Sequence, residues 1–101
     1  MDYGNRYLKE LKESSPSYYE FLQETHTLLD LSIEFQERAV ALEESLHYHY
    51  CYEKDLIQNA KSRKEEEITK GFISKWIVNH VYSELEKVFS IKREEYYENY
   101  H

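Results

Sequence analysis

The chain has 101 residues, a formal charge of −7 at pH 7, two glycines and one proline. This length suits one small domain, and the shortage of glycine and proline argues against a fold that needs many tight turns. The negative charge disfavours broad nucleic-acid binding, because phosphate backbones are also negative. The single cysteine excludes an internal disulfide framework. No apolar run approaches the roughly 18 residues that predict a membrane-spanning helix.

Residues 3–13 predict a short N-terminal helix, because apolar side chains recur along one side of it. A break follows, since Ser15 suits the N-cap of a new helix and Pro16 suits its first position. There the missing N–H of proline would have no partner in any case. We therefore assign residues 1–15 to a short helix followed by a break, and we expect a second helix from Pro16 onward.

The second predicted helix is very long. Neither glycine nor proline occurs from Ser17 to Lys70, and apolar residues recur there at helical rather than alternating spacing. Gly71 is the first residue that suits a helix C-terminus, and another helical pattern follows it. We therefore predict a long helical segment over residues 16–101, with a candidate break near residues 62–71.

Two all-α arrangements fit this pattern. In the first, a long helix, straight or with an elbow, follows the short N-terminal helix, and its polar stretch over residues 58–67 crosses solvent like a stalk. In the second, that stretch is a turn and the chain forms a compact three-helix antiparallel bundle. The Lys, Arg and Glu residues of the stretch are good helix formers, which favours the first arrangement.

The most unusual stretch, "LHYHYCYE", runs from Leu46 to Glu53 and combines two histidines with the only cysteine. A strand would place His47, His49 and Cys51 on one face, where they could contribute to a zinc site. The helical surroundings instead place His47 and Cys51 on one face and turn His49 to the opposite side. We therefore interpret the stretch as an aromatic and hydrogen-bonding ring that contacts partners, and we expect no metal and no cofactor.

No catalytic set stands out, because the sequence lacks a Gly-rich phosphate loop and a Gly-x-Ser-x-Gly turn. The aromatic residues of the C-terminal third are more informative, since Trp and Tyr are enriched at the energetic centres of protein interfaces. An ordinary bundle core would explain the same residues. Those that we expect at a protein interface are Phe72, Trp76, Ile77, His80, Val81, Tyr82 and Phe89, with Tyr48 and His49 upstream.

The C-terminal half also carries a pattern of charged, aromatic and imidazole residues. Its members are Arg63, Lys64, Glu65, Trp76, Ile77, His80 and Val81, preceded by Leu46, Tyr48 and His49. The segment over residues 62–89 resembles the C-terminal part of the peripheral-stalk b subunit of mitochondrial ATP synthase. In that family a charged Arg-Lys-Glu stretch leads to a Trp, a hydrophobic residue, two variable positions and His-Val. The spacings are longer here, and we find no counterpart to the family's membrane-embedded N-terminal part.

The resemblance implies a long polar helix that acts as a stator and docks on other subunits, on the matrix side of the inner mitochondrial membrane. We therefore expect a non-enzymatic structural subunit of a multi-protein assembly, with a peripheral-stalk component of mitochondrial ATP synthase as the named case. Its partners would be other protein subunits, with no nucleic acid and no membrane span in this chain. The alternative is a small acidic helical regulator of phage or bacterial type, in the cytoplasm, that occludes the surface of a target protein.

Overall fold

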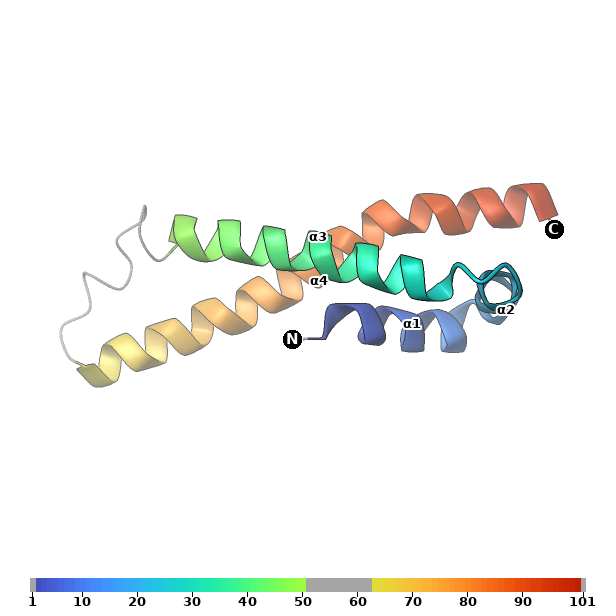
Figure 1. The fold of residues 1–101 in the computed structure, drawn as a ribbon. Helices are drawn as coiled ribbons and strands as arrows, with labels where there is room; N and C mark the ends of the chain where they lie inside the picture. Colours follow the sequence, from blue (N-terminus) through green and yellow to red (C-terminus); the bar gives the residue numbers. More distant parts are fainter. Residues whose placement is uncertain (1, 51–62, 101) are drawn as a thin grey trace.

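The computed structural model describes residues 2–50 and 63–100, and every regular element in them is a helix. The helices are α1 (Tyr3–Ser14), α2 (Pro16–Glu24), α3 (Leu28–Tyr48) and α4 (Arg63–Tyr100). A π-helical turn over residues 49–50 follows α3. Figure 1 shows α3 running antiparallel to α1 and α4, with α2 lying crosswise at one end. The prediction of an all-α chain with a long helix is confirmed.

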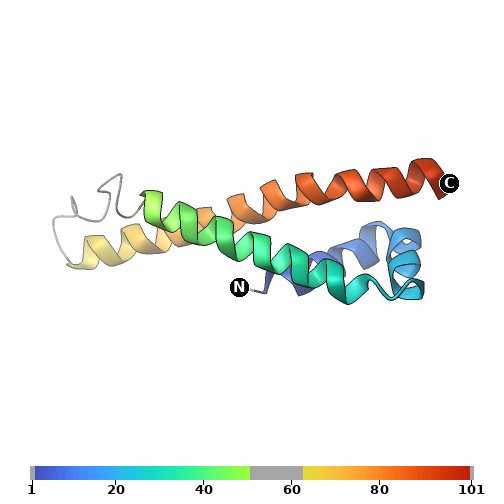
Figure 2. The ribbon, with the colours of Figure 1, turned by 45° about the horizontal axis from the view of Figure 1, so that its top comes forward.

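The molecule is elongated, with principal extents of 56 × 19 × 18 Å. α4 contains 38 residues. At 1.5 Å per residue its length is about 57 Å, so this one helix spans the whole molecule. Figures 1 and 2 show that the N-terminal part of α4 extends away from α1 and α2, whereas its C-terminal part lies at the end of the molecule where α2 is found. The bundle is therefore thick at one end and thin at the other.

Local sequence explains the first two helices. The carboxylate of Asp2 accepts a hydrogen bond from the backbone N–H of Asn5 at 3.2 Å, which caps α1. As the sequence predicts, Ser15 occupies the N-cap of α2 and Pro16 lies in its first turn. The side chain of Ser15, however, makes no capping hydrogen bond. The Ser15 N–H instead donates to the carbonyl oxygen of Leu11 at 2.8 Å, so α2 begins where the last turn of α1 closes.

The uninterrupted helix predicted as far as Lys70 is wrong, because the chain turns between α2 and α3. His26 adopts a left-handed backbone with φ of 58°. The N–H of His26 donates to the carbonyl of Gln23 at 3.3 Å, and that of Thr27 donates to the carbonyl of Leu22 at 2.9 Å. These two bonds form a Schellman motif, in which glycine usually takes the left-handed position. Histidine is one of the non-glycine residues that adopt the left-handed backbone more often than most. The end of α2 therefore has no glycine by which it could be predicted from the sequence.

The candidate break near residues 62–71 does not interrupt the described helix either, since residues 63–71 belong to α4. The long helix is therefore α4 rather than residues 16–70. Because α4 runs antiparallel to α3, the antiparallel bundle describes the arrangement better than an extended stalk. It has four helices in the described residues rather than three. Residues 51–62, which include Cys51, lie outside the described part of the chain.

Aromatic rings from three helices form the centre of the core. The ring of Tyr7 in α1 stacks on Phe35 in α3, with centroids 4.4 Å apart. The ring of Phe89 in α4 meets Tyr7 edge-on, with centroids 5.8 Å apart. The rings of Phe89 and Tyr82 are both tilted against Phe35, with centroid distances of 5.0 and 5.7 Å. Such pairs contribute about 0.5–1.5 kcal/mol each beyond the burial of their area. They therefore join α1, α3 and α4 into one cooperative unit.

α1 approaches α3 closely at Gly4. The backbone N–H of Gly4 donates to the side-chain oxygen of Gln36 at 2.9 Å. A Cβ atom added to Gly4 would lie 2.6 Å from both the carbonyl and the hydroxyl oxygen of Ser32. Gly71 in α4 has open space around the same position. The first glycine is therefore required by packing, whereas the second is not.

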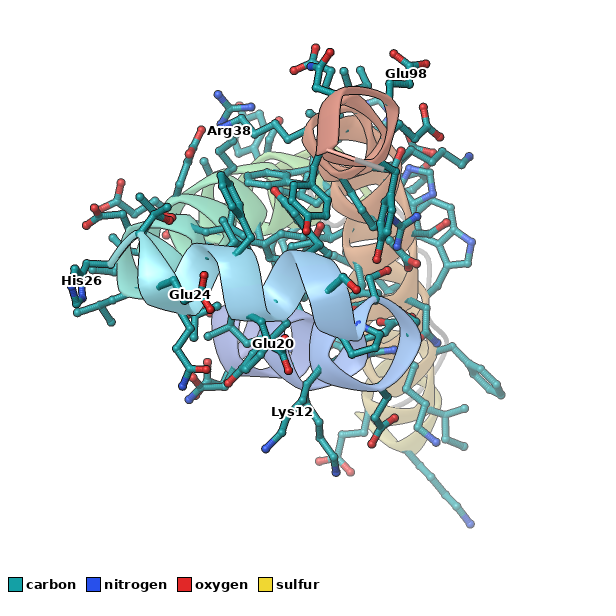
Figure 3. All side chains as sticks on the ribbon, turned by 90° about the vertical axis from the view of Figure 1, so that its right-hand side faces the viewer. Lys12, Glu20, Glu24, His26, Arg38 and Glu98 are labelled. Carbon is teal, nitrogen blue, oxygen red and sulfur yellow. The ribbon has the colours of Figure 1, made fainter. Side chains whose placement is uncertain are left out.

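Charged side chains surround this core. Figure 3 looks along the bundle, and its labelled side chains Lys12, Arg38 and Glu98 point outward from the helices. Among the described helices, none has both the length and the apolar character that crossing a membrane would require.

Candidate protein-interaction surface

The residues predicted for a protein interface separate into two groups. Ile77, Val81, Tyr82 and Phe89 belong to the chain's own core, and none of them is more than 4% exposed. They follow one another along the side of α4 that faces α1 and α3, so packing within the chain accounts for them. For these four residues the bundle-core explanation left open by the sequence fits the structure, and in this fold they cannot reach a partner.

The second group stays on the surface at the thin end of the bundle. Phe72 is 72% exposed, Trp76 47% and Tyr48 61%. His49 and His80 are half-buried beside them. Together with Tyr50 and Ile73, these residues form what we call the aromatic end surface, which consists of Tyr48, His49, Tyr50, Phe72, Ile73, Trp76 and His80.

Ring contacts join the two helices within the aromatic end surface. The indole of Trp76 stacks on the imidazole of His80, with centroids 4.8 Å apart and an interplanar angle of 8°. The ring of Tyr50 meets Trp76 edge-on at 5.0 Å, and His49 meets Tyr50 edge-on at 4.9 Å. Tyr50 is thereby held against α4, and Trp76 lies at the middle of the row.

An open cavity of about 220 Å³ lies in this surface, lined by Tyr50, Phe72, Ile73 and Trp76. Small-molecule sites generally enclose about 300–1,000 Å³ and bury most of the ligand. A smaller and open apolar hollow suits one or two side chains of another protein. Burying an exposed Phe side chain contributes about 1.5–3 kcal/mol to association, so this surface can supply an interface with its energetic centre.

The bundle accounts for the Trp-Ile-x-x-His-Val pattern without any partner. Ile77 and Val81 are fully buried, whereas Trp76 and His80 stack on each other at the surface. Pairs four residues apart share one face of a helix, and neighbouring residues lie about 100° apart around it. The pattern is therefore that of an amphipathic helix with one buried face and one aromatic outer face.

The histidines near the end of α3 take part in packing. The Nε2 atom of His47 lies 4.0 Å from a carboxylate oxygen of Glu43, whose other oxygen accepts a 2.6 Å hydrogen bond from the Tyr3 hydroxyl. In the described part of the chain, no three His, Cys, Asp or Glu side chains lie close enough to hold a metal ion. Cys51, the third member of the motif, lies outside the described residues.

A polar cluster links α1 to α4 at the edge of the core, and sequence reasoning missed it because its members are far apart in the chain. The Tyr82 hydroxyl donates to the Glu10 carboxylate. The Arg6 guanidinium lies 3.9 Å from the centroid of the Tyr82 ring, close enough for a cation–π interaction. Burial raises the pKa of the Glu86 carboxyl, and the nearby negative charge of Glu10 raises it further.

Tyrosine also contributes to the buried core, although it keeps a polar tip. Burial raises the pKa of the hydroxyl of each buried tyrosine above its usual range. For two of them a hydrogen bond to a carboxylate raises the pKa further. These four buried tyrosines are Tyr3, Tyr7, Tyr18 and Tyr82.

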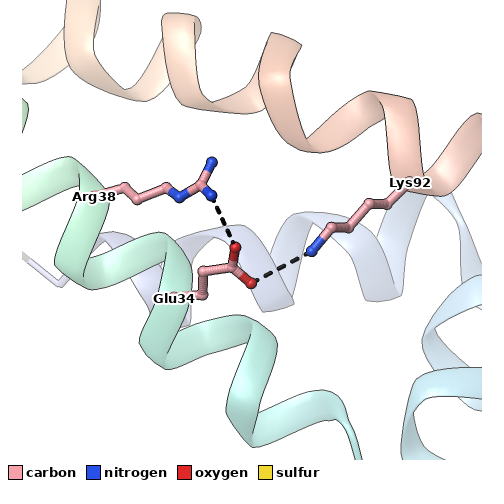
Figure 4. A network of polar contacts seen from close by, with 3 residues as sticks. All are labelled: Glu34, Arg38 and Lys92. Carbon is pink, nitrogen blue, oxygen red and sulfur yellow. Dashed lines mark hydrogen bonds and ion pairs between the residues drawn. The ribbon is translucent and has the colours of Figure 1, made fainter.

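A network of ion pairs positions α4 on α3 (Figure 4). The Glu34 carboxylate lies 3.2 Å from Arg38 on the same helix and 3.4 Å from Lys92 on α4. Both cations also lie near the ring of Phe89, at 5.6 and 5.7 Å from its centroid. Exposed ion pairs contribute about 0–1 kcal/mol, so the network adds orientation more than stability.

Comparisons of this chain with protein-family models, with curated proteins and with solved structures found no match. The fold and its surface therefore define a class of protein rather than a family. The described residues form an elongated all-α bundle with an internal aromatic core and an exposed aromatic surface at its thin end.

Proposed function

We propose that this chain is a non-enzymatic protein-binding module that docks on a partner through the aromatic end surface. The observation that carries the proposal is the exposure of Phe72 and Trp76 on a helix whose core face is already filled by its own chain. Large aromatic side chains in an open hollow are the usual anchors of protein interfaces. The lining of this hollow offers rings and one aliphatic side chain, which suits an apolar segment of another protein.

Of the two roles expected from the sequence, the small acidic helical regulator agrees better with this fold. An internal core lets the chain fold before it meets a partner, as a regulator that occludes a target surface must do. The charge of −7 suits a target whose surface is basic.

A peripheral-stalk component of mitochondrial ATP synthase, on the matrix side of the inner membrane, is the second proposal. It is supported by the length of α4, whose 38 residues include nearly all of the segment that resembles the b subunit. In this role the thin end of α4 would dock on other subunits of the stalk or the catalytic head.

Co-purification with matched variants tests the proposal. We expect the tagged wild-type chain to capture a partner, and the double variant Phe72→Ala/Trp76→Ala to capture it about 100-fold less or weaker still, since two anchors are lost. The control Val88→Ala/Ile91→Ala removes apolar side chains that are exposed on the same helix outside the aromatic end surface. It should capture the partner normally.

Equal capture by the aromatic double variant, with its melting temperature unchanged, would contradict the proposed docking surface. The identity of the captured chains separates the two roles. Subunits of the ATP synthase stalk or head would support the second proposal, whereas one unrelated target with a basic surface would support the first.

A further inference from the structure

α3 has a second apolar row that faces away from the core. Its buried side carries Leu31, Phe35 and Ala39, as expected for one helix of a bundle. On the other side Leu29, Ile33 and Val40 are 69%, 47% and 38% exposed. A surface helix needs only one apolar stripe, so the packing of the described residues does not use the second row.

Three acidic residues accompany this second row. Asp30, Glu37 and Glu44 follow one another at seven-residue intervals, and all three are exposed. At 100° per residue, the three carboxylates and the three apolar side chains lie within an arc of about 100° on α3. We call this the α3 outer face, and it consists of Leu29, Asp30, Ile33, Glu37, Val40 and Glu44.

The charges of the α3 outer face are not neutralised within the described residues. Glu34, nearer the core, pairs with both Arg38 and Lys92. By contrast, Asp30, Glu37 and Glu44 form no ion pair with any residue that the structure describes. A heptad-spaced row of one charge beside an apolar row is the pattern by which helices select partners of opposite charge.

We propose that the α3 outer face binds a basic amphipathic helix of a partner protein. Leu29, Ile33 and Val40 pack against the apolar row of that helix, and the three carboxylates pair with its lysines or arginines. α3 has 21 residues. At 1.5 Å per residue it is about 30 Å long, which accommodates about three heptads of a partner.

A second copy of this chain is a poor occupant of the same face. Two copies would bring the same three carboxylates together, and each whole chain carries a charge of −7. Like charges across an interface oppose association. A basic helix is therefore complementary in charge to the α3 outer face, whereas a second copy of this chain is not. The face shares no residue with the aromatic end surface, so its binding is measured independently of the function proposed above.

The test is titration of the full chain with three synthetic peptides, followed by calorimetry. The first peptide has about three heptads, with Leu and Ile at the core positions and Lys beside them. The second has Glu in place of every Lys, and the third is a scrambled version of the first. We expect only the first to bind, and its affinity to fall as salt is added, because salt screens surface charges.

Charge variants then locate the site. The triple variant Asp30→Asn/Glu37→Gln/Glu44→Gln should bind the basic peptide about tenfold more weakly and with less dependence on salt, as three modest ion pairs are lost. The matched control Glu20→Gln/Glu24→Gln/Glu98→Gln removes three exposed carboxylates elsewhere and should bind as the wild type does. Replacement of the apolar row by Ile33→Ser/Val40→Ser should also abolish binding while the melting temperature is kept.

Three results would overturn the proposal. The first is absence of binding by the basic peptide. The second is equal binding by its scrambled version or equal weakening by the control charge variant, either of which would show attraction by net charge alone. The third is sedimentation of the free chain as a dimer that the Ile33→Ser/Val40→Ser variant dissociates, which would identify a second copy as the occupant.

Discussion

Replacement of the two glycines by alanine should have opposite effects on stability. In the Gly4→Ala variant the new methyl group would meet two oxygen atoms of Ser32 at 2.6 Å, one of which belongs to the backbone of α3. Relief requires α1 to move away from α3, which also lengthens the hydrogen bond from Gly4 to Gln36. The Gly71→Ala variant meets no neighbour and only gains the higher helix propensity of alanine.

The magnitudes follow from these contacts. Overpacking costs about 1–3 kcal/mol, and a lost hydrogen bond about 0.5–1.5 kcal/mol. Alanine in a helix is more favourable than glycine by about 0.5–1 kcal/mol, so the net loss for Gly4→Ala is about 0.5–4 kcal/mol. Gly71→Ala should instead gain about 0.5–1 kcal/mol. Each kcal/mol corresponds to about 4–8 °C in melting temperature for a domain of this size.

Thermal unfolding followed by far-UV circular dichroism measures both variants against the wild type. A Gly4→Ala variant as stable as the wild type would refute the close approach of α1 to α3. A loss for Gly71→Ala equal to that for Gly4→Ala would show that the first effect does not come from packing.

Three further predictions concern a turn and two kinds of titrating group. His26→Gly should raise the free energy of unfolding by up to about 1 kcal/mol, because glycine adopts the left-handed backbone without a Cβ penalty. A lower free energy of unfolding, measured by urea denaturation, would contradict the Schellman turn. The raised pKa of Glu86 stabilises the fold at low pH and loses that effect as pH rises through the folded-state value. Glu86→Gln should therefore raise the melting temperature at pH 7 but not at about pH 4, near the usual pKa of a free Glu. An equal gain at both pH values would count against burial and the charge of Glu10 as the cause of the raised pKa. The four buried tyrosines have raised pKa values, so their contribution is complete below about pH 10 and is lost above it. Tyrosinate absorbance should show them ionising together with loss of helical dichroism, and ionisation of all tyrosines in one step with the helices intact would contradict their burial.

The sequence was sufficient to predict the features that depend on local chemistry. The Ser15-Pro16 pair set the start of α2, and the helical spacing of apolar residues after Gly71 indicated a helix there, although we expected Ile77 and Val81 at an interface rather than in the core. The helix propensity of the charged residues after Arg63 agrees with their place in α4. Each of these signals lies within a few residues of the structure that it predicts.

The remaining features depend on contacts between distant parts of the chain. At the turn after α2, the left-handed backbone position is held by His26, which can adopt this conformation without favouring it. Because no glycine stands there, the sequence pattern did not predict the turn. Phe72 and Phe89 belong to one helix and to one residue type, yet only Phe89 lies where α1 and α3 both meet α4. Which aromatic residues form the core and which form a docking surface therefore depends on how far α1 extends along α4.

That contrast between Phe72 and Phe89 also gives the most direct test of the account, which divides α4 into a core-forming part and a docking part. The measurement is the free energy of unfolding of Phe72→Ala and of Phe89→Ala in the isolated chain. Phe89 is 2% exposed and touches rings on two other helices, so its replacement should cost about 3–5 kcal/mol. Replacement of the exposed Phe72 should change stability by less than about 0.5 kcal/mol. Equal losses for the two variants, or a larger loss for Phe72→Ala, would contradict the division of α4 into a core and a docking surface.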